Sequence, residues 1–249
     1  LKRVRLELSD QNYVLRENLQ LREDIERIIH HDLKTPLNSI FVSPDIIRRD
    51  GGLNERQNRC LDDIQEAGRR MLTMINESLD LYKMETGTYE FQPNPIDLLD
   101  EIHRVIRENL ELEKLRGISV EILVDGLPVA DHDICTVSGE KLLIYSILSN
   151  IIKNSLEASP KEQTVNISIE DRELDRQVIL RINNQGAVPD EIRDRFFDKY
   201  VTSGKKSGTG LGTYSAKLMA EAQGATITMD TSEETGTTIT VCFTQPESC

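Results

Sequence analysis

The chain has 249 residues, enough for two domains or for one domain with a helical arm. A formal net charge of −13 and the absence of tryptophan argue against nucleic-acid binding, which usually needs a basic surface and aromatic stacking. The four cysteines Cys60, Cys135, Cys242 and Cys249 show no C-x-x-C spacing. Their scatter argues against a zinc site or a disulfide framework and favours a reducing, cytoplasmic setting.

No apolar run approaches the roughly 20 residues that a membrane-spanning helix needs, and no signal-peptide pattern is present. The first residue is leucine, not methionine. We therefore expect a fragment of a longer protein, in which any membrane anchor or sensor domain would lie upstream.

Residues 1–50 have the pattern of one long helix. Leucines recur every seven residues from Leu1 to Leu15, and polar side chains occupy the companion positions. This repeat predicts a coiled-coil signalling helix over residues 1–24, and polar residues in core positions favour a dimer.

A helical hairpin is expected next. Gly51 and Gly52 predict a helix end and a turn, and apolar residues at spacings of three and four predict a second helix from about Leu53 to Glu85. Two such helices cannot bury both apolar stripes alone, so we expect an all-α hairpin that dimerises into a four-helix bundle. The alternative is an antiparallel hairpin that packs on the second domain of its own chain.

From Ile96 onward the sequence mixes helical and strand patterns, which predicts an α+β two-layer sandwich of about 150 residues. Residues 91–95 are predicted to be a proline-punctuated linker. We expect helices near 97–114, 140–158 and 214–223, and strands near 118–124, 165–170, 178–182, 226–230 and 237–243.

Residues 31–36, with the sequence His-Asp-Leu-Lys-Thr-Pro, place reactive groups on one helix. At about 100° per residue, His31 lies roughly 200° from the apolar stripe around Ile29, and Thr35 lies one turn further on. His31 therefore faces solvent beside Thr35. A surface histidine usually has no role, and Asp32 can equally be an ordinary solvated charge. Pro36 costs about 3 kcal/mol inside a helix, so we expect a packing or a functional reason for it.

Four short stretches of the second domain contain residues that together could bind a nucleotide. Asn150 and Asn154 are i, i+4 neighbours, so two amides can converge on a phosphate–metal cluster; helix-surface asparagines without a role are the alternative. The stretch Gly208-Thr209-Gly210-Leu211-Gly212 opens a helix, where a glycine backbone can approach phosphates closely. The other two stretches are residues 182–189, at the end of a strand, and residues 196–200.

Residues 31–37 resemble the H-box of sensor histidine kinases of the HisKA type, and they match its pattern His-Glu/Asp-x-x-Thr-Pro-Leu without departure. The four later stretches resemble, in order, the N, G1, F and G2 boxes of the GHKL ATP-binding fold. Histidine kinases share that fold with the Hsp90, MutL and gyrase ATPases. The resemblance implies a dimerisation and histidine-phosphotransfer hairpin over 25–90 and an ATP-binding catalytic domain over 96–246.

The resemblance also implies ATP and Mg²⁺ as cofactors and assigns roles to individual residues. Asn154 is expected to bind the Mg²⁺, and Asn150 to face the phosphates. The expected ATP-binding residues are Asn150, Asn154, Asn184, Gly186, Tyr200, Lys205, Gly208, Thr209, Gly210, Leu211 and Gly212.

Two positions depart from the family pattern. The G1 box normally supplies an aspartate to the adenine amino group, whereas this chain offers asparagine, whose oxygen can accept the same bond. Strand alternation favours Asn184, and an alignment without a gap favours Asn183. Glu157 stands where a basic residue often follows the N-box. Lys205 or Lys206 can replace that charge, or they can be solvated loop lysines.

The resemblance further implies an autokinase. Hydrolysing relatives carry a water-activating glutamate at the position of Asn150, which is no base, so His31 is expected to take the γ-phosphoryl group, with Asp32 orienting its ring. The phosphate would pass to an aspartate of a response-regulator receiver domain. Thr35 stands where the family positions a water, which makes a phosphatase activity plausible. The alternatives are a degenerate nucleotide-binding homodimer that acts as a scaffold or only as a phosphatase, and a simple ATPase.

Overall fold

The computed structural model describes residues 34–130, 132–203 and 209–246. The predicted coiled-coil segment 1–24 lies outside these residues. The chain divides into two compact units between Lys83 and Met84, and each unit is described by itself.

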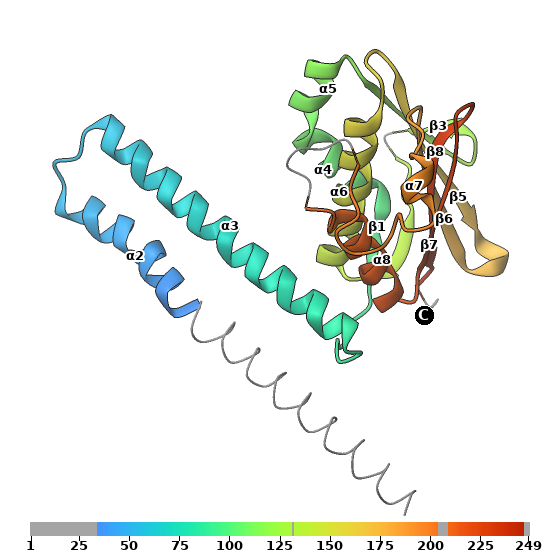
Figure 1. Ribbon diagram of the computed structural model, residues 1–249. Helices are drawn as coiled ribbons and strands as arrows, with labels where there is room; N and C mark the ends of the chain where they lie inside the picture. The colour runs from blue at the N-terminus through green and yellow to red at the C-terminus, as the bar shows by residue number, and fades with distance from the viewer. Residues whose placement is uncertain (1–33, 131, 204–208, 247–249) are drawn as a thin grey trace, which may run out of the picture. The chain divides into compact units, whose positions relative to one another are not determined.

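The first unit contains a helical hairpin, as predicted (Figure 1). Its helices are α2 (Lys34–Asp50) and α3 (Glu55–Glu85), and the last two residues of α3, Met84 and Glu85, belong to the second unit. Gly51 and Gly52 both have a φ of 75°, a conformation that favours glycine, and this explains why α2 ends there. Asn54 and Gln57 then start α3 with reciprocal hydrogen bonds, because the side chain of each accepts from the backbone N–H of the other at 2.9 Å.

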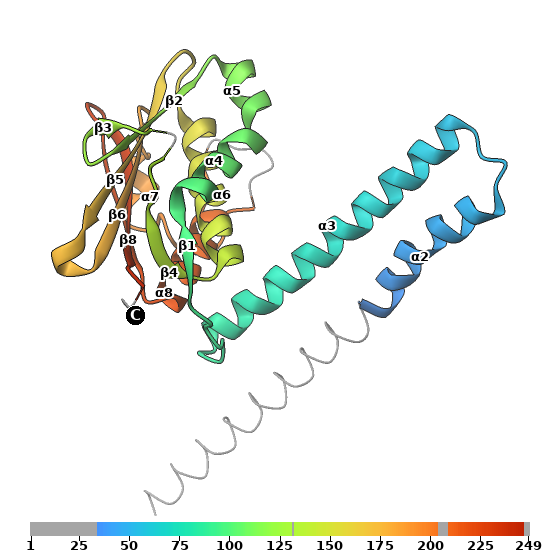
Figure 2. The same cartoon turned by 180° about the vertical axis from the view of Figure 1, so that it is seen from behind.

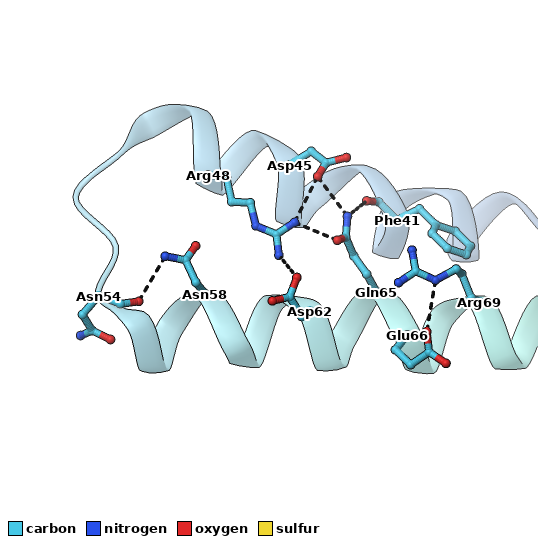
Figure 3. A network of polar contacts seen from close by, with 9 residues as sticks. All are labelled: Phe41, Asp45, Arg48, Asn54, Asn58, Asp62, Gln65, Glu66 and Arg69. Carbon is cyan, nitrogen blue, oxygen red and sulfur yellow. Dashed lines mark hydrogen bonds and ion pairs between the residues drawn. The ribbon is translucent and has the colours of Figure 1, made fainter. Parts of the chain in front are cut away.

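A polar network fixes the register of the two helices near the turn (Figure 3). The guanidinium of Arg48 donates to Gln65 Oε1 at 2.8 Å and to Asp62 Oδ1 at 2.5 Å. The Gln65 amide donates in turn to Asp45 Oδ1 at 3.0 Å and to the backbone oxygen of Phe41 at 3.3 Å. These bonds join three residues of α2, Phe41, Asp45 and Arg48, to two residues of α3, Asp62 and Gln65.

Further along the hairpin the two helices approach closely at Gly68. A Cβ atom on Gly68 would lie 3.3 Å from Ile40 Cγ2, a tight contact that the Ile40 side chain would have to relieve by a small shift. Leu37 and Leu61 are buried, but much of the apolar surface of the hairpin is not. The large apolar side chains that stay exposed on α2 and α3 are Ile40, Val42, Ile46, Ile47, Ile64, Met71 and Met74.

The second unit is an α+β two-layer sandwich, which confirms the predicted fold class. Its six-stranded sheet has the order β3-β2-β5-β6-β8-β7, and β2 and β5 are its parallel neighbours. The strands are β1 (Asn94–Asp97), β2 (Ser119–Val124), β3 (Leu127–Pro128), β4 (Thr136–Gly139), β5 (Thr164–Arg172), β6 (Gln177–Asn184), β7 (Thr226–Ser232) and β8 (Gly236–Thr244).

Helices α4, α6 and α8 form the second layer on one face of this sheet (Figures 1 and 2). The helices of the unit are α4 (Leu98–Glu108), α5 (Leu110–Arg116), α6 (Lys141–Ala158), the short 3-10 helix η2 (Glu173–Asp175), α7 (Asp190–Arg193) and α8 (Gly212–Ala222). No helix within the described ranges combines the length and the hydropathy of a membrane span.

Helix α6 is the centre of the core. Burial alternates along β5 and β8, so that each strand turns one face to the helices, where α6 packs its apolar side. The fully buried large side chains of α6 are Ile144, Ile147, Leu148, Ile151, Ile152 and Leu156. Each contributes about 1.5–3 kcal/mol of hydrophobic stabilisation. This anchoring holds the rest of α6, including its two asparagines, in a fixed position.

Several elements differ from the sequence-based prediction. Strands β1, β3 and β4 and the short helices η2 and α7 were not expected, and one expected helix is split. The expected linker ends in a strand, because β1 pairs antiparallel with β4, with Ile96 opposite Val137. Pro95 is tolerated in this two-stranded ladder, where not every N–H needs a partner. The expected helix over 97–114 is split at Asn109, whose side-chain amide donates to the backbone oxygen of Val105 at 2.8 Å and so competes with helix continuation.

Candidate nucleotide-binding site

The second unit has a cavity of about 850 Å³ between α6, the end of β6, residues 196–203 and the start of α8. This volume is within the range of roughly 300–1,000 Å³ that is typical of small-molecule sites. Several predicted site residues line it, and they come from three motifs that are far apart in the sequence. These lining residues are Asn150, Asn154, Asn184, Gly186, Thr209, Gly210 and Gly212.

Asn150 and Asn154 project from α6 toward the first residue of α8. A Cβ atom on Gly212 would lie 3.2 Å from Asn150 Oδ1 and 3.7 Å from Asn154 Nδ2. The two amides therefore meet the beginning of an eleven-residue helix, where backbone N–H groups lack intrahelical partners and the helix dipole is positive. A polar group with several acceptor oxygens, such as a phosphate, suits this place.

Asn184 forms the part of the wall at the end of β6, and its side chain is buried, with 3% of the residue exposed. Its amide nitrogen donates to the backbone oxygen of Gly186 at 3.2 Å, and the Thr237 hydroxyl donates to the same oxygen at 2.6 Å. Because the nitrogen is engaged, the side chain can offer its oxygen as an acceptor to a group in the cavity.

Asn183, the alternative to Asn184, lies on the other face of β6. Its amide nitrogen donates to Thr238 Oγ1 at 2.9 Å and to the backbone oxygen of Thr235 at 3.1 Å. It does not line the cavity. The alternation of side chains along a strand explains the difference between the two neighbours.

The backbone of Tyr200, which precedes the glycine-rich stretch 208–212, contacts Gly210 within that stretch. The Tyr200 N–H donates to the Gly210 oxygen at 2.9 Å. A Cβ atom on Gly210, whose φ is 66°, would lie 2.5 Å from the carbonyl carbon of Tyr200, so this approach requires glycine. Tyr200 and Leu211 do not themselves line the cavity. Lys205 and Gly208 lie outside the described residues.

The phosphoacceptor motif is described only in part. His31 and Asp32 lie outside the described residues, and Thr35 lies in the first turn of α2. The roles expected for these three residues stay predictions.

Arg116, at the end of α5, is a lining residue that sequence reasoning missed. Its guanidinium donates to the backbone oxygens of Glu157 and Ser159, both at 2.7 Å, and so holds the end of α6. The Arg116 guanidinium therefore lies beside Glu157, which also lines the cavity. Glu157 is the residue that stands where related proteins often have a basic side chain after the N-box. No sequence motif identifies Arg116 as a residue of the site, because it reaches the cavity only through the packing of α5 on α6.

Apolar residues complete the wall next to Asn184. They follow β6 in the sequence or come from the neighbouring strand β8, and they provide a surface on which a flat ring can lie. These residues are Val188, Pro189, Ile192 and Ile239.

A divalent cation at this site would depend on the nucleotide for most of its ligands. The described residues contain no cluster of three or more His, Cys, Asp or Glu side chains that could hold a metal. The donor set of the cavity nevertheless fits Mg²⁺, which commonly takes one or two protein oxygens and completes its shell with phosphate oxygens and water. The amide of Asn154, beside the start of α8, is such a donor.

Comparisons with known families match both units. Residues 21–87 match the family described as the His Kinase A (phospho-acceptor) domain. Residues 139–247 match the family described as histidine kinase-, DNA gyrase B-, and HSP90-like ATPase.

Curated relatives and solved structures agree with these matches. The sensor histidine kinase WalK of Bacillus subtilis is 29% identical over 234 residues, 91% of this chain and 37% of the relative. The histidine protein kinase DivJ of Caulobacter vibrioides is 25% identical, over 85% of this chain and 35% of the relative. The chain thus spans little more than a third of the length of these relatives.

Among solved structures, full-length ShkA in complex with AMPPNP aligns with a TM-score of 0.66 and 18% identity, over 91% of this chain and 47% of that chain. The Acinetobacter baumannii histidine kinase AdeS aligns with a TM-score of 0.57 and 18% identity, over 87% of this chain and 98% of that chain. Similarity at this level of identity concerns the fold.

Proposed function

The chain belongs to the sensor histidine kinases of two-component systems, and on this basis we propose that its second unit binds Mg²⁺–ATP for transfer of the γ-phosphoryl group to His31. The observation that carries the proposal is the approach of Gly212 to the amides of Asn150 and Asn154 inside the cavity. It supports a phosphate position between two helices, and the buried amide of Asn184 and the apolar wall support an adenine position.

The residues of the nucleotide site would have separate tasks. Asn184 accepts a hydrogen bond from the adenine amino group, and the backbone near Gly210 and Gly212 surrounds the phosphates. Asn154 supplies an oxygen ligand to Mg²⁺, which neutralises phosphate charge when bound. Asn150 cannot act as a base toward water, so this site favours transfer to a protein nucleophile over hydrolysis.

His31 is the proposed nucleophile. A neutral imidazole is a competent nucleophile near pH 7, and Asp32 can hold the proton on Nδ1 so that the Nε2 lone pair is free. The Nε2–phosphorus bond forms while the bond from the γ-phosphorus to its bridging oxygen breaks, and that electron pair leaves with ADP. The product is a cationic phosphoimidazole that Asp32 stabilises.

We further propose that the chain acts as a homodimer through its hairpin. The exposed apolar side chains of α2 and α3, among them Ile46, Ile47 and Met71, support this proposal, because an apolar face of this extent is rarely left in water. Two hairpins together can bury these side chains in a four-helix bundle.

The proposed acceptor of the phosphoryl group is an aspartate on a response-regulator receiver domain. The membership of the chain in the sensor histidine kinases supports this partner. Thr35, one helical turn after His31, would orient a water for the reverse phosphatase reaction.

The nucleotide site is tested with Asn154→Asp. We expect the affinity for Mg²⁺–ATP, measured by calorimetry, to fall about tenfold or more, equivalent to ~1.4 kcal/mol or more, because a carboxylate would face the phosphates. Asn166→Asp makes the same chemical change on β5, away from the cavity wall, and should bind normally. An unchanged Mg²⁺-dependent affinity in Asn154→Asp would contradict the proposed site.

A further inference from the structure

A single carboxylate connects residues on both sides of the glycine-rich stretch 208–212. Glu85 Oε1 accepts a hydrogen bond from Lys199 Nζ at 2.6 Å and another from the Tyr214 hydroxyl at 2.9 Å. Lys199 Nζ also lies 5.0 Å from the centre of the Tyr214 ring, so the three side chains form one cluster. All three belong to the second compact unit.

The two donors, Lys199 and Tyr214, are close in sequence to residues that surround the cavity. Lys199 directly precedes Tyr200, whose N–H donates to the Gly210 oxygen. Tyr214 lies in the first turn of α8, two residues after Gly212, which approaches Asn150. A shift of either donor would therefore be passed through the backbone to residues that surround the cavity.

The two donors of the cluster hold their protons more tightly than usual. The hydrogen bond to Glu85 raises the pKa of Lys199, and burial followed by the hydrogen bond to Glu85 raises the pKa of Tyr214. Both donors therefore keep their protons. The Glu85 and Lys199 side chains are 29% and 39% exposed, and ion pairs of this kind add little to global stability. The cluster is thus better suited to placing chain segments than to holding the fold.

We propose that Glu85 is a positioning residue for the nucleotide site. It holds Lys199 and Tyr214 together, and with them the Tyr200–Gly210 contact and the start of α8, in the arrangement that places Gly212 against the α6 asparagines. The inference rests on the proposed nucleotide site.

The test compares Glu85→Gln with Glu90→Gln, an exposed carboxylate in the same segment. Glu85→Gln should weaken binding of Mg²⁺–ATP about fivefold, at the lower end of the range for coupled sites, while the melting temperature changes little. Amide hydrogen exchange of residues 209–216 without nucleotide should become faster. Glu90→Gln should match the wild type in both measurements.

A double-mutant cycle separates positioning from a general charge effect. If Glu85 acts through Lys199, the double variant Glu85→Gln/Lys199→Met should bind Mg²⁺–ATP no more weakly than the weaker single variant. Fully additive losses would contradict the inference, as would wild-type affinity and wild-type exchange in Glu85→Gln. A wild-type chain that binds no Mg²⁺–ATP would contradict the proposed function, whereas equal binding by wild type and Glu85→Gln would contradict this inference alone.

Discussion

Gly212 at the start of α8 lies so close to Asn150 of α6 that a Cβ atom there would be 3.2 Å from Asn150 Oδ1. This contact brings together two motifs that are far apart in the sequence, one with paired amides and the other with free backbone N–H groups. We propose that phosphates bind at this contact and that the base binds next to Asn184.

Asn184→Ala should reduce discrimination between purine bases. The variant removes the acceptor that suits the adenine amino group, so the affinity for ATP should fall about tenfold, while the affinity for GTP, which presents an oxygen at that position, should change much less. Calorimetry with both nucleotides measures the two affinities. Equal losses for ATP and GTP would argue against a role for Asn184 in base recognition.

The fold could be predicted largely from periodicity, because most elements bury one face and leave the other in water. The sheet strands β5 and β8 are examples, whereas the hairpin turn was predicted from the glycines Gly51 and Gly52. Strand β1 was missed because its four residues include Pro95 and bury little surface, and its formation depends on β4 as a partner. The break between α4 and α5 likewise depends on a side-chain bond that no periodic pattern reveals.

The part of the candidate site that is formed by sequence motifs could be predicted. Asn150, Asn154 and the glycine-rich segment have recognisable spacing, and alternation along β6 favours Asn184 over Asn183. Arg116 and Glu85 have no such signal. Tertiary packing alone brings Arg116 to the end of α6 and Glu85 to Lys199.

Leu148→Ala should destabilise the second unit strongly. Leu148 is fully buried on α6, and removing such a side chain leaves a cavity that costs about 2–5 kcal/mol in the free energy of unfolding. Leu142→Ala is the matched control, since Leu142 lies on the same helix but is 75% exposed, and it should change stability by about 0.5 kcal/mol or less. Urea unfolding measures both. Similar losses in the two variants would contradict the packing described for α6.

Cys135 should make stability depend on pH in the alkaline range. Burial, with a smaller effect of nearby carboxylates such as Asp171, raises the pKa of its thiol from the ordinary 9.0 to about 12. The folded chain then holds this proton more tightly than the unfolded chain, so its stabilisation is complete below pH 9 and is lost progressively between pH 9 and about 12.

Cys135→Ala should remove this part of the pH dependence. Between pH 8 and pH 10 the wild type should lose about 1.4 kcal/mol more unfolding free energy than the variant. Urea unfolding at the two pH values gives the comparison. Identical slopes for wild type and variant would show that the Cys135 thiol is not protected from ionisation in the folded chain.

The most direct test of the account is the transfer of radioactivity from γ-phosphate-labelled ATP to the protein in His31→Gln. Glutamine keeps a polar side chain but offers no nucleophilic nitrogen, so labelling should be abolished while calorimetry shows wild-type affinity for Mg²⁺–ATP. His30→Gln, the same change one residue earlier, should still be labelled. Acid-labile label in His31→Gln at the wild-type level would contradict the assignment of the phosphoacceptor.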